Sequence, residues 1–130
     1  MNPEQVVNSY FRAVEEGDVA AVLSLCHPAV EIWHSFNDQV SSIDQITAQL
    51  GAALGLGRLS YVVQEQIVAN DRVLRRHRAR FDTPTGKQVE FPIAVFTTVK
   101  NGLITRIDEY VDSAALARVM AAAPGVPASA

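Results

Sequence analysis

The chain has 130 residues, enough for one domain with a real core and too few for two. Its 11 basic and 14 acidic residues give a net charge of −3, which excludes a general attraction to nucleic acid or to an anionic membrane. The single cysteine, Cys26, excludes an intramolecular disulfide and is typical of a reducing compartment. No basic leader or apolar membrane span is seen, so we expect a cytoplasmic protein without nucleic-acid or membrane partners.

Two helices are predicted at the start of the chain. Residues 2–5 combine an asparagine N-cap, a first-turn proline and a capping-box glutamine, and apolar residues then recur at helical spacing as far as Gly17. Asp18 is placed to cap a second short helix, which Pro28 terminates from just outside. The two helices are therefore expected to meet at a corner formed by Gly17 and Asp18.

A strand and a third helix are expected next. Residues 30–34 alternate between apolar and polar side chains, as a half-buried strand does. Ser42 and Gln45 then form a second capping box. This pair predicts a helix from about residue 43 to residue 54.

From Leu59 onward the hydrophobic period changes to two. Turn sequences at residues 70–71, 83–87 and 101–102 divide this region into four antiparallel strands of about ten residues each. Strands of this length twist and bend, and Pro92 indicates a bulge or an edge in the third of them. We therefore expect an α+β fold, in which a strongly curved, mostly antiparallel sheet wraps around the N-terminal helices and leaves a cone-shaped pocket.

The last strand is predicted at residues 103–111, with Asp112 as the N-cap of a final helix. Alternation assigns its residues to two faces. The apolar face carries Thr105, Ile107, Glu109 and Val111, and the other face carries Ile104, Arg106, Asp108 and Tyr110. The domain is expected to span residues 1–122, with residues 123–130 as a flexible tail.

The element order helix, helix, strand, helix and meander, together with the segments 9–18, 30–34 and 101–112, resembles the nuclear transport factor 2-like superfamily. The similarity is greatest to its SnoaL-like branch and covers roughly residues 3–120. It implies a cystatin-like fold. The superfamily includes polyketide cyclases, ketosteroid isomerase, limonene epoxide hydrolase, dehydratases and many proteins that are not enzymes, so the pocket must decide the function.

Ketosteroid isomerase can be aligned with the chain at the shared Gly-Asp corner. The resemblance places Tyr10 at its oxyanion-hole tyrosine and His34 at its general-base aspartate. The second oxyanion donor of that family is a protonated aspartate, and Ala94 stands at this position here. Steroid isomerisation by that route is therefore not expected.

Limonene epoxide hydrolase can be aligned at a shared Pro-Thr-Gly-Lys turn. Glu109 then coincides with one of its two catalytic aspartates and Arg76 with its bridging arginine, but Arg78 replaces the other aspartate. The match predicts that Arg76 and Arg78 face the pocket, whereas the opposite face of strand 73–81 carries more apolar residues. The pattern leaves both orientations open.

The first functional hypothesis is a cofactor-independent cyclase, isomerase or dehydratase acting on a mostly apolar, carbonyl-bearing substrate. His34 titrates near neutrality and would move the proton, and Glu109 would orient it or act as its partner acid. Tyr10, with Arg76 or Arg78, would stabilise the enolate oxygen. The substrate site is expected to include Trp33, Phe36, Arg76, Arg78 and Phe96.

The second hypothesis is a non-catalytic ligand-binding or dimerisation domain of the same fold. Under both hypotheses we expect a homodimer through the open side of the meander, which bears Ile104 and Tyr110. Burial would raise the pKa of Glu109 and contact with an arginine would lower it, and the sequence does not choose between them. Metal-ligand spacing and a glycine-rich phosphate loop are both missing from the sequence, so we expect no metal and no cofactor.

Overall fold

The first two helices have the predicted caps in the computed structural model, which describes residues 1–122. The N-terminal residues 2–5 form both bonds of a capping box at the start of α1 (Pro3–Glu16). Gly17 ends this helix with a left-handed φ of 69°, a conformation that glycine adopts without strain. Asp18 then caps α2 (Val19–Ser24), so the expected Gly-Asp corner is confirmed.

The two later helices also begin at their predicted caps. Ser42 starts α3 (Ile43–Leu54) with a capping box. Asp112 accepts a hydrogen bond of 3.0 Å from a backbone N–H in the first turn of α4 (Ser113–Ala122). The tail predicted at residues 123–130 lies outside the described residues.

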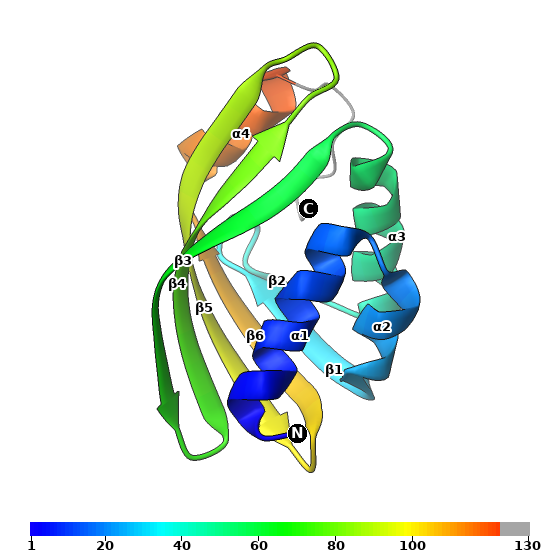
Figure 1. Ribbon diagram of the computed structural model, residues 1–130, viewed down its shortest axis with the longest axis vertical. Coiled ribbons are helices and arrows are strands. Elements are labelled where there is room, and N and C mark those ends of the chain that lie inside the picture. The colour runs from blue at the N-terminus through cyan, green and yellow to red at the C-terminus, as the bar shows by residue number, and fades with distance from the viewer. Residues whose placement is uncertain (123–130) are drawn as a thin grey trace.

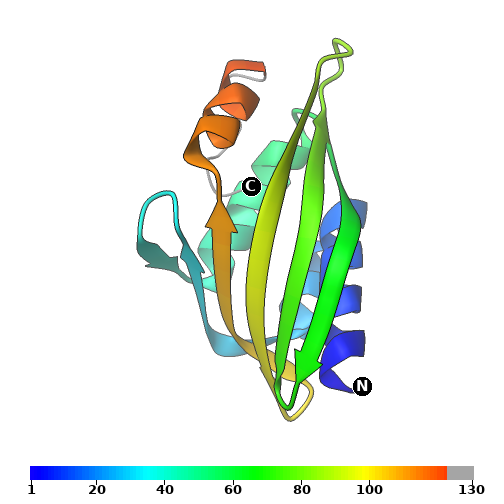
Figure 2. The same cartoon turned by 90° about the vertical axis from the view of Figure 1, so that its left-hand side faces the viewer.

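The strands are β1 (Cys26–His34), β2 (Gln39–Ser41), β3 (Arg58–Ala69), β4 (Arg72–Asp82), β5 (Gln88–Lys100) and β6 (Leu103–Val111). They form one sheet in the order β2-β1-β6-β5-β4-β3. All neighbouring pairs are antiparallel except β1 and β6, which run parallel. Figure 1 shows α1, α2 and α3 on the concave side of the bent sheet, and Figure 2 shows the strands from the opposite side. The predicted curved α+β architecture is thus confirmed.

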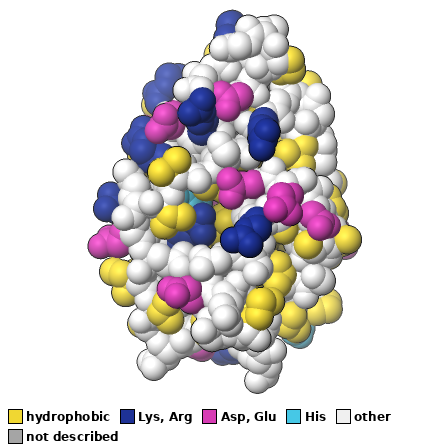
Figure 3. All heavy atoms as spheres, in the orientation of Figure 1, with side chains coloured by type: hydrophobic (Ala, Val, Ile, Leu, Met, Phe, Trp, Pro, Cys, Tyr) yellow, Lys and Arg dark blue, Asp and Glu magenta, His cyan; other side chains and the backbone are white. Residues whose placement is uncertain are grey.

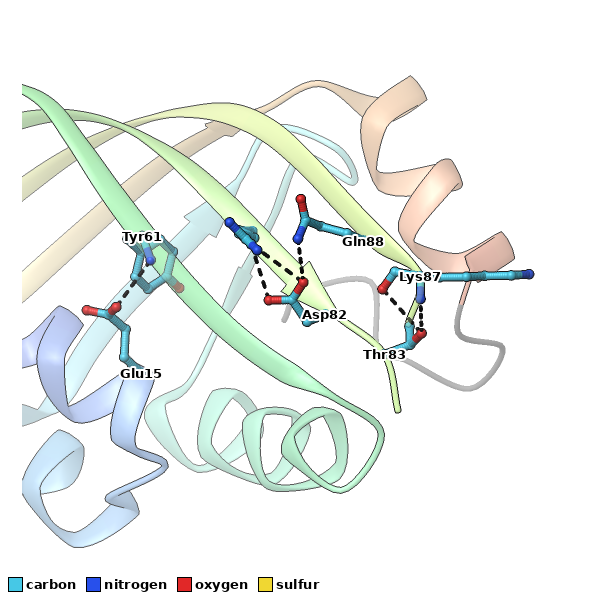
Figure 4. Close-up of polar contacts among 7 residues, drawn as sticks. Glu15, Tyr61, Asp82, Thr83, Lys87 and Gln88 are labelled. Atoms are coloured by element: carbon cyan, nitrogen blue, oxygen red, sulfur yellow. Dashed lines mark hydrogen bonds and ion pairs between the residues drawn. The ribbon is translucent and has the colours of Figure 1, made fainter. Parts of the chain in front are cut away.

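The hairpin turns of the meander lie where the sequence predicts them. Asn70 and Asn101 have positive φ values of 56° and 51°, as tight hairpin turns require. In the 83–87 turn, the backbone N–H of Thr83 donates to the carbonyl of Lys87 at 2.8 Å, and the Thr83 hydroxyl accepts from the Lys87 N–H (Figure 4). These local bonds fix the register of β3 to β6.

The strand β1 begins four residues earlier than predicted and includes Pro28. Its ladder with β6 is interrupted between Cys26 and Glu31, and Pro28 is exposed within this irregular stretch. Proline has no N–H to donate, so it is tolerated where the ladder is broken. The same reason explains Pro92, because the β5–β6 ladder begins only at Ile93 and leaves Pro92 on a local edge.

A bulge in β6 corrects the predicted faces of that strand. Thr98 of β5 pairs with Arg106, but the next residue of β5 pairs with Ile104, so Thr105 is an extra residue. Ile104 and Ile107 therefore both point toward the helices, and Ile104 has no exposed surface. The expectation that Ile104 belongs to an open dimer face is wrong.

The orientation of β4 also differs from the one favoured by the epoxide hydrolase match. Its odd-numbered residues are buried, and its even-numbered arginines lie on the outer face. The inward orientation predicted for Arg76 and Arg78 is wrong, because the face with more apolar side chains packs against α1. The core between α1 and the sheet includes Val6, Val7, Phe11, Val73, Ala79, Phe81, Val95 and Ile107.

Candidate functional site

A small cavity lies between α1, α3 and the concave face of the sheet. Its volume is about 40 Å³, and most of its wall is aliphatic or aromatic. Four of its lining residues carry a polar group that can bind or transfer a proton. These residues are Tyr10 on α1, His34 on β1, Tyr61 on β3 and Glu109 on β6.

His34 and Glu109 meet in this cavity because their strands are parallel neighbours. The two residues are paired in the β1–β6 register, so their side chains leave the sheet at the same level and on the same face. The distance from Nε2 of His34 to the nearer carboxyl oxygen of Glu109 is 3.8 Å. His34 is 3% exposed and Glu109 is 18% exposed, so the pair is largely withdrawn from solvent.

Burial makes His34 a neutral group at pH 7. Desolvation lowers its pKa to about 4, because the imidazolium form loses its hydration inside the protein. Its Nδ1 atom has no hydrogen-bond partner among residues 1–122. The expectation that His34 titrates near neutrality is therefore wrong.

Burial has the opposite effect on Glu109. Desolvation raises its pKa to about 7, so the carboxylic acid and the carboxylate are both well populated at neutral pH. Within residues 1–122 no arginine offsets this effect, because Arg76 pairs with Glu65 and Arg78 with Glu90 on the other side of the sheet. The sequence left open whether burial raises the pKa of Glu109 or contact with an arginine lowers it. In the structure, burial determines this pKa.

Two buried tyrosines complete the polar lining. Desolvation raises the pKa of Tyr10 far above its ordinary value, and the charges of Cys26 and Glu109 raise it further. The pKa of Tyr61 is also raised, chiefly by burial. Both phenols therefore keep their protons at neutral pH and serve as hydrogen-bond donors.

Tyr61 is a cavity residue that the sequence analysis did not identify. It shares the face of Leu59, which is buried, and the period-two rule applied from Leu59 would have placed it inside. Its backbone N–H donates to the carboxylate of Glu15 on α1 at 3.2 Å, which ties this part of β3 to the helix (Figure 4).

The predicted aromatic substrate residues lie elsewhere. Trp33 and Phe96 both pack edge-on against Tyr110 on the outer face, with ring centroids 5.1 and 5.8 Å from the Tyr110 ring. Phe36 lies beside the His34 ring at 5.3 Å but does not line the cavity. These three residues do not line the cavity, because Trp33 and Phe96 alternate to the outer face and Phe36 follows the end of β1.

Three outer-face arginines of β4 form ion pairs, two with neighbouring strands and one within β4 itself. The Arg78 Nε lies 2.8 Å from Glu90, the Arg76 Nε 3.6 Å from Glu65, and Arg80 contacts Asp82 at 3.3 Å. Figure 3 shows basic and acidic side chains interleaved on the surface in the orientation of Figure 1. The basic strand therefore forms a solvated ladder of ion pairs, outside the cavity.

A metal centre and a membrane-spanning helix are both absent from the described part of the chain. Within residues 1–122 no group of three or more histidine, cysteine or acidic side chains is arranged to hold a metal ion. No helix in that range is both long and apolar enough to cross a membrane. The chemistry of the cavity must therefore be argued from its own four polar residues.

Comparison with known proteins identifies a family. The family model of the SnoaL-like domain matches residues 7–107. Among solved structures, IdmH, a candidate polyketide cyclase from Streptomyces antibioticus, is 18% identical with a TM-score of 0.81, over 92% of this chain and 99% of that one. A nuclear transport factor 2-like protein from Burkholderia thailandensis is 24% identical with a TM-score of 0.76, over 92% and 98% of the two chains.

An LEH-like epoxide hydrolase from M. tuberculosis is also similar. It is 14% identical with a TM-score of 0.76, over 88% of this chain and 81% of that one. No curated protein sequence matches the chain. At these identities the solved structures establish the fold alone.

Proposed function

Because the chain belongs to the SnoaL-like domain family, we propose that its cavity binds a small, mostly apolar, carbonyl-bearing molecule and moves a proton on it without a cofactor. One observation supports this most. Glu109 and His34 lie side by side in a mostly apolar cavity, and burial raises the pKa of Glu109 to about 7. A general acid or base works best when its pKa is close to the working pH.

In the proposed reaction, ionised Glu109 takes a proton from the carbon next to the substrate carbonyl. The C–H electron pair becomes a carbon–carbon double bond, and the carbonyl π pair moves to oxygen to give an enolate. Tyr10 keeps its own proton and donates a hydrogen bond to that oxygen, which stabilises the developing charge. This assigns the proton transfer to Glu109 and not to His34, whose pKa of about 4 makes it a weak base.

His34 then acts as the partner of Glu109. Its neutral imidazole lies 3.8 Å from the carboxyl group and is placed to accept a hydrogen bond when Glu109 is protonated. Contacts of this kind are often long in a ligand-free site and shorten when substrate binds. The pair thereby holds the transferred proton close to the substrate.

The enolate can continue in three ways within the same cavity. Return of the proton from Glu109 to another carbon gives an isomer. Loss of a hydroxyl group from the β-carbon, protonated by Glu109 as it leaves, gives a dehydrated enone and water. Attack of the enolate carbon on a second carbonyl closes a ring, and the resulting alkoxide takes the proton from Glu109.

The proposal is tested by proton exchange on a panel of small cyclic ketones in D₂O, followed by NMR. We expect the protein to accelerate exchange at the carbon next to the carbonyl. The Glu109→Gln variant should lower this rate by about a hundredfold to ten-thousandfold, as loss of a general base does. Glu90→Gln on the outer face is the matched control and should exchange at the wild-type rate.

His34→Ala completes this comparison. It should reduce exchange less than Glu109→Gln, because it removes the partner and leaves the base in place. Unchanged exchange in both Glu109→Gln and His34→Ala, beside an active wild type, would contradict the mechanism.

The size of the cavity favours a second candidate function, a non-catalytic ligand-binding domain. A volume of about 40 Å³ holds roughly three water molecules, and sites for drug-sized ligands are about 300–1,000 Å³. A ketone that shifts the NMR signals of the cavity residues but shows no accelerated exchange would favour this candidate.

We also propose that the outer face of the sheet pairs with a second copy of the chain. Tyr110 is half exposed there between Trp33 and Phe96, and Val62 and Ile67 of β3 are 60% and 50% exposed. Apolar side chains gathered on one face are typical of an interface.

A further inference from the structure

A buried arginine and histidine lie together on the inner face of β4. Arg75 is 6% exposed and its Nε donates a hydrogen bond of 2.9 Å to Nδ1 of His77, which has no exposed surface. Because the guanidinium keeps its proton, Nδ1 must be the acceptor, and the hydrogen of the neutral ring is on Nε2. Desolvation, and then the charge of Arg75, lower the pKa of His77 to about 3, so the ring stays neutral.

This pair supports two walls of the cavity. The His77 ring is stacked on Tyr61, with ring centroids 4.4 Å apart and an angle of 30° between the planes. It also meets Phe11 edge-on at 5.0 Å, and the guanidinium carbon of Arg75 lies 4.3 Å from the centre of the Phe11 ring. Phe11 and Tyr61 both line the cavity, so the pair holds them from behind.

Apolar packing alone does not explain why polar side chains occupy the buried positions of Arg75 and His77. The Nε2 atom of His77 has no hydrogen-bond partner and Arg75 has no ion pair among residues 1–122. A buried unpaired N–H and a buried cation both destabilise a fold. Apolar residues at the two positions would avoid both costs, so the pair calls for an explanation in terms of the cavity.

The surroundings of the Tyr61 hydroxyl provide an explanation for the buried pair of Arg75 and His77. Tyr61, Tyr10 and Glu109 line the same cavity. The charges of Glu109, Tyr10 and Glu15 raise the pKa of Tyr61, whereas the charge of Arg75 lowers it. A positive charge behind a phenol makes the phenol a stronger hydrogen-bond donor. The backbone bond from Tyr61 to Glu15 fixes the same residue from the side of α1.

We propose that Tyr61 is a second hydroxyl donor to the ligand oxygen, beside Tyr10, and that Arg75 and His77 are positioning residues that hold its ring. This inference rests on the function proposed for the cavity. It also narrows the ligand class, because two hydroxyl donors on different walls suit one oxygen that accepts two hydrogen bonds. An enolate or a phenolate oxygen has this property.

Fluorine NMR of protein labelled with 3-fluorotyrosine tests the donor role. The chain has three tyrosines, so three signals are expected, and each is assigned with a Tyr→Phe variant. On addition of ionised 4-nitrophenol, the signals of Tyr10 and Tyr61 should both shift. Tyr110, which is half exposed on the outer face, is the internal control and should not shift.

The affinity for 4-nitrophenolate measures how much the Tyr61 hydroxyl contributes to binding. Tyr61→Phe keeps the ring and removes the hydroxyl, and it should weaken 4-nitrophenolate binding by about tenfold to a hundredfold, as expected for a hydrogen bond to a charged group. A shift of Tyr10 alone, with unchanged affinity in Tyr61→Phe, would overturn this inference and leave the proposed function intact. The absence of a shift at both cavity tyrosines would overturn both.

The positioning role is tested separately on Arg75. Arg75→Met removes the donor to His77, so the Tyr61 signal should move or broaden in the free protein and the probe should bind several-fold more weakly. Arg75→Lys should partly restore the Tyr61 signal and the affinity for the probe, because an ammonium can donate to Nδ1 of His77. A Tyr61 signal and an affinity that are unchanged in folded Arg75→Met would contradict the role.

The wild-type protein provides a measurement that does not depend on the folding of any variant. Nitrogen NMR of ¹⁵N-histidine should find His77 neutral, with its hydrogen on Nε2, from pH 4 to pH 8. A His77 that carries its hydrogen on Nδ1, or that titrates near its ordinary pKa, would exclude the positioning pair.

Discussion

His34 and Glu109 are register partners in the parallel β1–β6 ladder, and burial shifts their pKa values in opposite directions. Each shift favours the neutral form of its group. At pH 7 the pair therefore consists of a neutral imidazole and a carboxyl group that is about half protonated. This combination stores one exchangeable proton in the cavity without placing a cation there.

The raised pKa of Glu109 predicts a dependence of stability on pH. A carboxyl group whose pKa is 4.5 when unfolded and about 7 when folded stabilises the fold below pH 4.5, and this contribution is lost as the pH rises to about 7. Glu109→Gln lacks this titration. From pH 4.5 to pH 7.5 its free energy of unfolding should therefore rise relative to wild type by about 3 kcal/mol, measured by urea denaturation.

The two buried histidines also make stability depend on pH, so the effect of Glu109 must be measured as the difference between Glu109→Gln and wild type. The lowered pKa values of His34 and His77 make stability rise with pH up to about 6.5, opposite in sign to the effect of Glu109. Both histidines remain in Glu109→Gln, so their effects cancel in the comparison with wild type. A constant difference between the two proteins across this range would show that Glu109 titrates as it does in water.

Adjacent arginines on β4 should respond very differently to substitution. Arg76→Ala removes an exposed ion pair with Glu65 and should change the free energy of unfolding by less than about 1 kcal/mol. Arg75→Ala removes a buried side chain that bonds His77 and covers Phe11, and should destabilise the fold by about 2–4 kcal/mol. Equal losses in urea denaturation would contradict the assignment of the two faces.

Local side-chain chemistry made the boundaries of this fold predictable. Residues 2–5, Asp18, Ser42 and Asp112 satisfy free backbone groups within a few residues of themselves, so the sequence alone indicates where the four helices of residues 1–122 begin. The same holds for the Asn101-Gly102 turn, whose backbone needs positive φ. None of these signals depends on packing against distant residues.

The faces of the strands depended on distant packing and were predicted less well. Long cationic side chains occupy both faces of β4, so alternation did not reveal that Arg75 and His77 point toward α1 and Arg78 away from it. One extra residue, Thr105, reverses the face of Ile104. The protonation states of His34 and Glu109 follow from burial, which the sequence does not specify.

Two glycines near the end of α3 give a matched pair of opposite predictions. A Cβ on Gly57 would lie 2.5 Å from the Phe81 ring and 2.6 Å from the carbonyl oxygen of Asp82, so Gly57→Ala should destabilise the fold by about 1–3 kcal/mol. Gly51 lies inside α3 with nothing within 4 Å of the added carbon. Gly51→Ala should stabilise by about 0.5–1 kcal/mol. Thermal unfolding that moves both variants in the same direction would contradict these contacts.

The proposed dimer predicts which surface substitutions separate two copies. Tyr110→Arg places a cation at the centre of the outer face, between Trp33 and Phe96, and should convert a dimer to a monomer in sedimentation velocity at micromolar concentration. Leu23→Arg on α2 is the control, because Leu23 is also exposed, at 40%, but lies on a helix on the other side of the sheet. A stable interface buries about 800 Å² per partner, so loss of its central aromatic residue should dominate the effect. A wild type that sediments as a monomer, or equal dissociation by Leu23→Arg, would show that the outer face is not the interface.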